Sequence, residues 1–186
     1  MWMTMDQLTG LPTHNDLPRM LTDLRGPAEG DKLCAVFVDI DALRQLSLTR
    51  GWQEVDDVLA RLGGWLQAEA LTLHGHVVRM AGDEFLLLLP GASMDATEAV
   101  AQKLVDGCTA LRIPCEGSED GREALAMSAV AFTMPREVVT GFPELRERLA
   151  SAIYAKKQAV GRNYGVVTTL ESGSGLTIQH WDALRR

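Results

Sequence analysis

Hydrophobic residues along the chain follow two patterns, stripes at helical spacing and short continuous runs. In residues 15–24, leucine and methionine recur three and four positions apart, which predicts a helix. Similar stripes predict longer helices from Trp52 onward, over residues 95–111 and over residues 143–160, where Gly161 is the expected C-cap. These amphipathic helices need an apolar surface to cover.

Continuous apolar and β-branched runs have the length of strands that are covered on both faces. They span residues 34–40, 76–80, 84–89, 124–132 and 164–169. The second and third runs are separated by Ala81, Gly82 and Asp83, a turn-forming spacer that predicts a β-hairpin. Because a hairpin excludes a purely parallel doubly wound sheet, we expect an α+β fold, a central and mostly antiparallel sheet flanked by helices.

Length and composition indicate one soluble domain of 186 residues, of which 46% are hydrophobic and 23% charged. A net charge of -7 argues against nucleic acid as a partner, since such binding usually needs a basic face. The three cysteines lack the paired spacing of a zinc site, and no run reaches the roughly 18 apolar residues of a membrane-spanning helix. We therefore expect a cytoplasmic protein without a membrane span, with a folded domain over residues 1–170 and a loosely attached tail over residues 171–186.

Acidic residues end or connect these predicted strands. Asp39 and Asp41 are two positions apart, so both side chains point to one side if the strand persists through Asp41. The hairpin turn supplies Asp83 and Glu84, and pairing of the hairpin with the first strand would bring these carboxylates to the same edge of the sheet. Oxygen ligands of this kind suit Mg²⁺ or Mn²⁺ held together with substrate phosphates, as in phosphoryl or nucleotidyl transfer.

These acidic residues also have structural interpretations. Asp41 is a good N-cap for a helix over residues 42–47, and Gly82 with Asp83 forms an ordinary turn. Asp39, which ends an apolar strand, is harder to explain in this way because burial of an unpaired carboxylate is costly. The two acidic sites together therefore favour a functional role.

Short motifs, taken in order, resemble the signatures of the GGDEF family of diguanylate cyclases. They are Asp6-x-Leu-Thr-Gly-Leu-Pro12, Phe37-Val-Asp-Ile-Asp41, Arg79-x-Ala-Gly-Asp-Glu-Phe85, Ser128 and Gly161-Arg-Asn163. The third motif is a variant, AGDEF, because Ala81 stands where the family signature has its first glycine. The resemblance implies the family's palm-like, ferredoxin-like nucleotide cyclase fold and the condensation of two GTP molecules into cyclic di-GMP across a transient homodimer.

The resemblance also implies roles for the acidic residues. Asp39 and Asp83 would bind Mg²⁺ or Mn²⁺, with the carbonyl of Ile40 as a further ligand. Glu84 would assist metal binding or deprotonate the attacking 3′-hydroxyl. Gly82 would leave room for the nucleotide to approach the turn.

Further residues match positions that bind the nucleotide in the family. Asp56 would accept hydrogen bonds from guanine, although a solvated carboxylate on a helix surface is an equal alternative. Ser47 stands where the family has an asparagine that contacts guanine, and its hydroxyl reaches less far. Lys157 and Arg162 would bind phosphate, but they lie five residues apart instead of one helical turn, and capping of the helix end is the alternative.

Other departures from the family pattern bear on activity and control. Trp52 and Val55 replace a polar and a small residue near the expected base pocket, which Val55 would narrow. The family's inhibitory Arg-x-x-Asp would fall at residues 72–75, where neither charged residue is present, so we expect no inhibitory site. Because the chain begins almost at the first motif, we expect control by a regulatory protein partner, the tail or concentration. The sequence leaves open a diguanylate cyclase, a cyclase of relaxed base choice, and a degenerate GGDEF domain that binds GTP or a protein partner without turnover.

Overall fold

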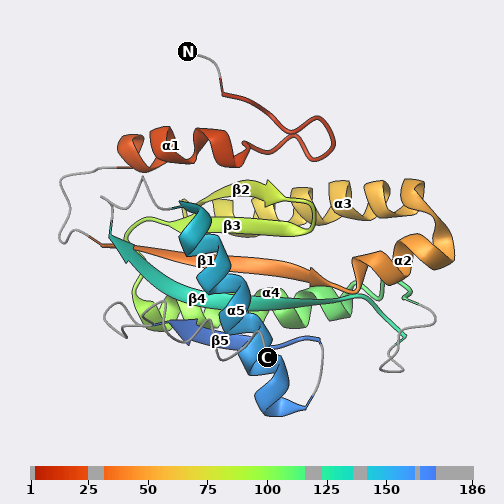
Figure 1. The fold of residues 1–186 in the computed structure, drawn as a ribbon. Helices are drawn as coiled ribbons and strands as arrows, with labels where there is room; N and C mark the ends of the chain where they lie inside the picture. Colours follow the sequence, from red (N-terminus) through yellow and green to blue (C-terminus); the bar gives the residue numbers. More distant parts are fainter. Residues whose placement is uncertain (1–2, 25–31, 116–122, 136–141, 162–163, 171–186) are drawn as a thin grey trace.

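The computed structural model describes residues 3–24, 32–115, 123–135, 142–161 and 164–170, and Figure 1 shows how their helices and strands are arranged. The helices are η1 (His14–Asp16), α1 (Leu17–Asp23), α2 (Leu43–Arg50), α3 (Trp52–Leu71), α4 (Met94–Ala110) and α5 (Phe142–Val160). The strands are β1 (Lys32–Asp41), β2 (His76–Ala81), β3 (Glu84–Leu89), β4 (Ala126–Pro135) and β5 (Val167–Leu170). Each predicted helix and strand is present, with shifts of a few residues at the ends.

The strands form one sheet in the order β2-β3-β1-β4-β5. Strand β1 pairs antiparallel with both β3 and β4, β2 and β3 form the predicted hairpin, and β5 lies parallel to β4. The expected α+β fold with a mostly antiparallel central sheet is therefore confirmed. Because β1 is the central strand, the residues near its end have neighbouring strands on both sides.

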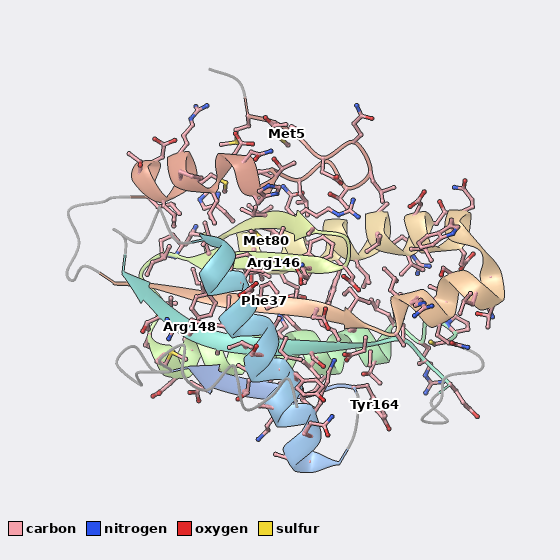
Figure 2. All side chains as sticks on the ribbon, in the orientation of Figure 1. Met5, Phe37, Met80, Arg146, Arg148 and Tyr164 are labelled. Carbon is pink, nitrogen blue, oxygen red and sulfur yellow. The ribbon has the colours of Figure 1, made fainter. Side chains whose placement is uncertain are left out.

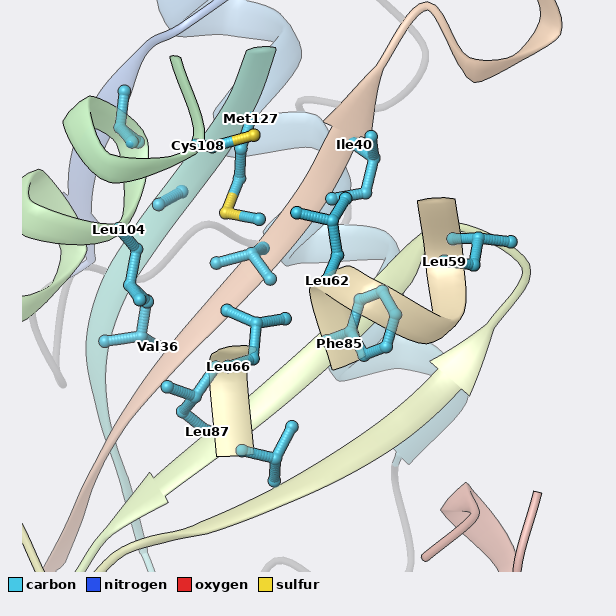
Figure 3. Close-up of a cluster of buried hydrophobic side chains, with 14 of the residues drawn as sticks. Val36, Ile40, Leu59, Leu62, Leu66, Phe85, Leu87, Leu104, Cys108 and Met127 are labelled. Atoms are coloured by element: carbon cyan, nitrogen blue, oxygen red, sulfur yellow. The ribbon is translucent and has the colours of Figure 1, made fainter. Parts of the chain in front are cut away.

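Helices cover both faces of this sheet. Helices α3 and α4 lie behind it in Figure 1, and α5 crosses its near face. Because successive side chains of a strand point to opposite faces, the even positions of β1 pack toward α3 and α4. Figure 3 shows this core, which includes Val36, Ile40, Leu62, Leu66 and Leu104. The odd positions, such as Phe37, face α1 and α5 instead, and Asp39 and Asp41 continue that row.

Asp41 does not act as the helix cap that its local sequence predicts. Strand β1 runs through Asp41, and α2 starts only at Leu43, after Ala42 in the left-handed conformation (φ 61°) without a side-chain cap. The carboxylate of Asp41 is buried and accepts hydrogen bonds from distant parts of the chain. The N-cap prediction is therefore wrong, because long-range contacts take the acceptor that the helix start would have used.

Two sequence expectations concern the ends and the environment of the domain. The tail over residues 171–186, together with the boundary expected at residue 170, lies outside the described residues. Within the described part of the chain, no helix is both long and apolar enough to cross a membrane.

Candidate active site

The end of β1 and the turn of the β2–β3 hairpin lie side by side. Asp39 of β1 is the register partner of Glu84 at the start of β3. The backbone N–H of Ile40 donates to the carbonyl of Asp83 at 3.1 Å, which holds the turn against the strand. The sheet register thus brings Asp39, Asp83 and Glu84 to the same end of the sheet.

Asp39 and Asp83 are incompletely compensated by positive charge. Burial, followed by repulsion from Asp83, raises the pKa of Asp39 to about 7, and the nearby Lys157 ammonium offsets only part of this. Burial also raises the pKa of Asp83, with a further contribution from Glu84. Partly buried carboxylates with like charges nearby are stabilised by a divalent cation.

Glu84 is held by a basic residue that no sequence motif identified. Arg146 of α5 forms a bidentate pair with it, in which Nη2 donates to Oε1 at 2.9 Å and Nε donates to Oε2. The hydrogen bond to Glu84 raises the pKa of Arg146. The Glu84 side chain is 10% exposed and that of Arg146 is 44% exposed, so the guanidinium covers a mostly buried carboxylate. Figure 2 shows Arg146 where α5 crosses the sheet.

Asp41 is the centre of a second, mostly buried polar cluster. Its carboxylate accepts hydrogen bonds from Ser128 Oγ at 2.8 and 3.0 Å and from the backbone N–H of Gly165 at 2.9 Å. Lys157 of α5 pairs with Asp41 and lies 3.6 Å from a carboxylate oxygen of Asp39. The Lys157 side chain is only 15% exposed, so these two carboxylates, and not water, are its main partners.

Arg146 and Lys157 belong to one stripe of α5 that faces the sheet. Between them lie Leu149 and Ile153, both buried, at successive spacings of three, four and four residues. This spacing is the sequence signal that could have pointed to Arg146. The spacing alone does not show that Glu84 is the partner of Arg146, because that depends on the path of α5 across the sheet.

Arg79 fastens the hairpin turn to the N-terminal segment. Its Nε and Nη2 donate to the Gly82 carbonyl at 3.1 and 2.8 Å, and its Nη1 donates to Asp6 Oδ1 at 2.7 Å. Although burial raises the pKa of Asp6, hydrogen bonds from Thr9 and Arg79 outweigh it and lower that pKa. Gly82 has φ 48°, and a Cβ atom there would meet no atom within 4 Å, so open space lies beside the turn. Ala81 has no positive φ, so its extra methyl group adds no backbone strain.

The remaining candidate residues lie on the α2–α3 pair or outside the described residues. Ser47 donates its hydroxyl to a backbone carbonyl of its own helix at 2.7 Å. Asp56 is exposed on α3. Val55 is buried in the core, whereas Trp52 is exposed. Arg162 lies outside the described residues.

The donor groups at the turn suit a hard divalent ion in their chemistry. Mg²⁺ is usually held by one or two carboxylates together with phosphate oxygens and water. Asp39 and Asp83 are such a pair, and burial is the main cause of their raised pKa values, with repulsion from neighbouring carboxylates adding to it. Among the residues that the structure describes, no group of three or more Asp, Glu, His or Cys side chains is arranged as a metal cluster. The two carboxylates of Asp39 and Asp83 fit an ion that is bound together with substrate phosphates.

The motifs, the fold and this site agree with a known family. The family model described as diguanylate cyclase, GGDEF domain, matches residues 3–163. The chain belongs to the GGDEF family. The GGDEF match includes the acidic residues of both clusters, and also Arg146 and Lys157.

Curated relatives of this GGDEF domain are named for opposite activities. The diguanylate cyclase DgcP of Pseudomonas aeruginosa is 28% identical over 156 residues, which cover 83% of this chain and 22% of that protein. The cyclic di-GMP phosphodiesterase PdeR of Escherichia coli is 30% identical over 110 residues, which cover 59% of this chain and 16% of that protein. The chain thus spans less than a quarter of the length of either relative.

A solved structure shows the same fold. The coiled coil and GGDEF domain of DgcB from Caulobacter crescentus, in complex with c-di-GMP, superimposes with a TM-score of 0.69. The match covers 90% of this chain and 85% of that chain at 22% identity. At this identity the likeness establishes the GGDEF fold and carries no statement about activity.

Proposed function

We propose that this GGDEF domain is a diguanylate cyclase that condenses two GTP molecules into cyclic di-GMP, with Mg²⁺ or Mn²⁺ and across a homodimer. The observation that carries the proposal is the convergence of Asp39 and Asp83, both with a raised pKa, beside the open turn at Gly82. Carboxylates that are buried beside one another destabilise the fold unless a cation compensates their charge. A divalent ion that also binds the triphosphate would do so. Membership of the family supports the same chemistry.

In this proposal the chain's own residues bind and orient the nucleotide. A bound divalent ion would neutralise the charge that develops on the phosphates. Asp39 and Asp83 would hold that ion through their carboxylate oxygens, with the Ile40 carbonyl as a further ligand. Glu84 would take the proton of the attacking 3′-hydroxyl, which requires a carboxylate oxygen that is not hydrogen-bonded to Arg146.

Recognition of the base would rest on Asp56, whose exposed carboxylate suits the N–H donors of guanine. The hydroxyl of Ser47 would add little, since it already bonds to its own helix. Lys157 and Arg162 would contact the phosphates, and for Lys157 this requires release from Asp41. Because each protomer would supply one GTP, turnover needs a transient homodimer. A regulatory protein partner and a cytoplasmic location are further parts of the proposal.

A second candidate function is a degenerate GGDEF domain that binds GTP or a protein partner without turnover. It is favoured by the ion pairs of Arg146 and Lys157, which occupy Glu84 and Asp41. In that case both pairs would be permanent parts of the fold. The two candidates therefore differ in whether the pairs open when metal and GTP are present.

Incubation of the purified domain with GTP, ATP or both, in Mg²⁺ or Mn²⁺, tests the proposal when the products are identified by mass spectrometry. We expect cyclic di-GMP from GTP, and its loss in Asp83→Asn and Glu84→Gln. Asp106→Asn, at an exposed position on α4, is the matched control and should retain the product. Product from either site variant would refute the assigned residues. GTP binding without product at high protein concentration would support the degenerate domain instead.

A further inference from the structure

Glu84 is paired with Arg146 at both of its carboxylate oxygens. Nη2 of Arg146 donates to Oε1 at 2.9 Å, and Nε donates to Oε2. Bidentate pairing of this kind fixes the plane of the carboxylate and uses the lone pairs that face the guanidinium. Because the Glu84 side chain is only 10% exposed, water cannot fully replace this partner. Arg146 is therefore the counter-ion of Glu84 in the structure.

A divalent ion and Arg146 compete for the same group. Both need oxygen lone pairs of Glu84, and their positive charges repel each other at contact distance. An ion that binds at the turn therefore weakens the pair, and the pair weakens the binding of the ion. Ion binding and formation of the Arg146–Glu84 pair therefore oppose each other, each weakening the other by the same free energy.

Arg146 can leave Glu84 while α5 stays in place. It lies near the start of α5, and its side chain is 44% exposed, so solvent is directly accessible to the guanidinium. The rest of the helix is anchored independently of Glu84 by the buried side chains of Leu149 and Ile153. Exchange of the guanidinium for an ion is thus a local event.

We propose that Arg146 neutralises Glu84 in the metal-free domain and that divalent-ion binding at the Asp83–Glu84 turn displaces it, so that Arg146 sets the metal affinity of the site. The proposal rests on the metal site of the proposed function. Arg146 acts through Glu84 and is not a catalytic residue. At low metal concentration Arg146 compensates the charge of the buried carboxylate, and when metal binds the ion takes over that compensation.

Mn²⁺ binding to the nucleotide-free domain, measured by electron paramagnetic resonance, tests this exchange. Arg146→Gln should bind Mn²⁺ about tenfold or more tightly than the wild-type domain, because a neighbouring charge shifts an ionic equilibrium by about one to three powers of ten. Arg148→Gln is the matched control, since it removes the same charge from an exposed position on α5. Figure 2 shows Arg148 to the left of α5. The control should change the affinity by less than about twofold.

A double-mutant cycle tests whether Glu84 carries the effect. In a Glu84→Gln background, the gain from Arg146→Gln should disappear, because the group for which ion and guanidinium compete is no longer charged. A gain that persists in this background would place the effect of Arg146 elsewhere.

Thermal unfolding supplies a second readout that also reports folding. In chelator, Arg146→Gln should melt at a lower temperature than the wild-type domain, because it leaves Glu84 without its counter-ion. Mn²⁺ should raise the melting temperature of Arg146→Gln by more than it raises that of the wild-type domain. Arg146→Lys keeps the charge but loses the bidentate geometry. It replaces the Gln variant if that variant does not fold, and should bind Mn²⁺ more tightly than the wild-type domain.

Equal Mn²⁺ affinity of the Arg146→Gln and wild-type domains, an equal gain in Arg148→Gln, or no measurable Mn²⁺ binding by any of these proteins would overturn the proposal. These outcomes are distinct from those of the mass-spectrometric test. Cyclic di-GMP formation without an effect of Arg146 would reject the exchange alone. Tighter Mn²⁺ binding by Arg146→Gln without any product would reject the cyclase alone.

Discussion

Replacement of Asp41 by alanine removes the acceptor that joins β1, β4 and the segment after α5. In the folded protein this carboxylate accepts hydrogen bonds from Ser128 Oγ at 2.8 and 3.0 Å and from the Gly165 N–H at 2.9 Å. It also pairs with Lys157, whose only other carboxylate neighbour among the described ion pairs is Asp39 at 3.6 Å. Asp41→Ala therefore weakens the pairing of a mostly buried cation and leaves two donors without this acceptor.

The free energy of unfolding should fall by about 4–5 kcal/mol in Asp41→Ala. Breaking a buried ion pair costs about 3–5 kcal/mol when one charge is left behind. Lys157 keeps 15% exposure and its second neighbour, which reduces this cost to about 2–3 kcal/mol. The two donors without this acceptor add about 1 kcal/mol each. The total is a large part of the about 5–15 kcal/mol that stabilises a typical domain.

Urea unfolding followed by circular dichroism, in the presence of chelator, measures this loss. Asp41→Ala should lower the midpoint with an unchanged slope, since the surface exposed on unfolding stays the same. Ser128→Ala should cost about 1–2 kcal/mol, because it removes a single hydroxyl donor. Asp106→Ala, on the exposed surface of α4, is the control and should stay within about 0.5 kcal/mol of the wild-type domain. A loss below about 1 kcal/mol for Asp41→Ala at an unchanged slope would refute the reasoning.

Three further changes test other parts of the structure. Because the folded-state pKa of Asp39 is raised to about 7, above the unfolded value of about 3.9, its contribution to stability is lost as pH rises from about 4 to 7. Relative to Asp39→Asn, the wild-type domain should therefore lose about 2–4 kcal/mol between pH 4 and pH 8 in urea unfolding, and parallel pH profiles would contradict this. Gly75→Ala should lower the free energy of unfolding by about 2–4 kcal/mol, since the added Cβ would lie 2.7 Å from a backbone oxygen of β3. Gly64→Ala is the control, because a Cβ there would meet no atom within 4 Å, and it should stabilise α3 by about 0.5–1 kcal/mol. Arg79→Lys loses the forked contact with the Gly82 carbonyl and should cost about 1–2 kcal/mol by the same assay; no loss would show that this contact does not hold the turn.

The local spacing of hydrophobic residues was sufficient to predict the helices, the strands and the mostly antiparallel sheet. The apolar runs at residues 34–40 and 84–89 correspond to β1 and β3, and the stripe at residues 143–160 corresponds to α5. The spacing at which side chains return to the same face is set by the local backbone, helical or extended, so neighbouring residues in the sequence reveal it. The spacer before Glu84 likewise predicts the hairpin, and with it the acidic turn beside the end of β1.

Tertiary structure decided which charges meet. Asp41 has the local sequence of a helix cap, yet it is a buried acceptor because β4 and the segment after α5 bring Ser128 and Gly165 to it. Arg146 lies in no motif and reaches Glu84 only because α5 crosses the sheet there. These contacts join residues 62 to 124 positions apart, a separation about which local periodicity carries no information. The sequence by itself therefore determined the fold class and the position of the acidic turn, and only the packing of α5 on the sheet decided which carboxylates are already paired with cations.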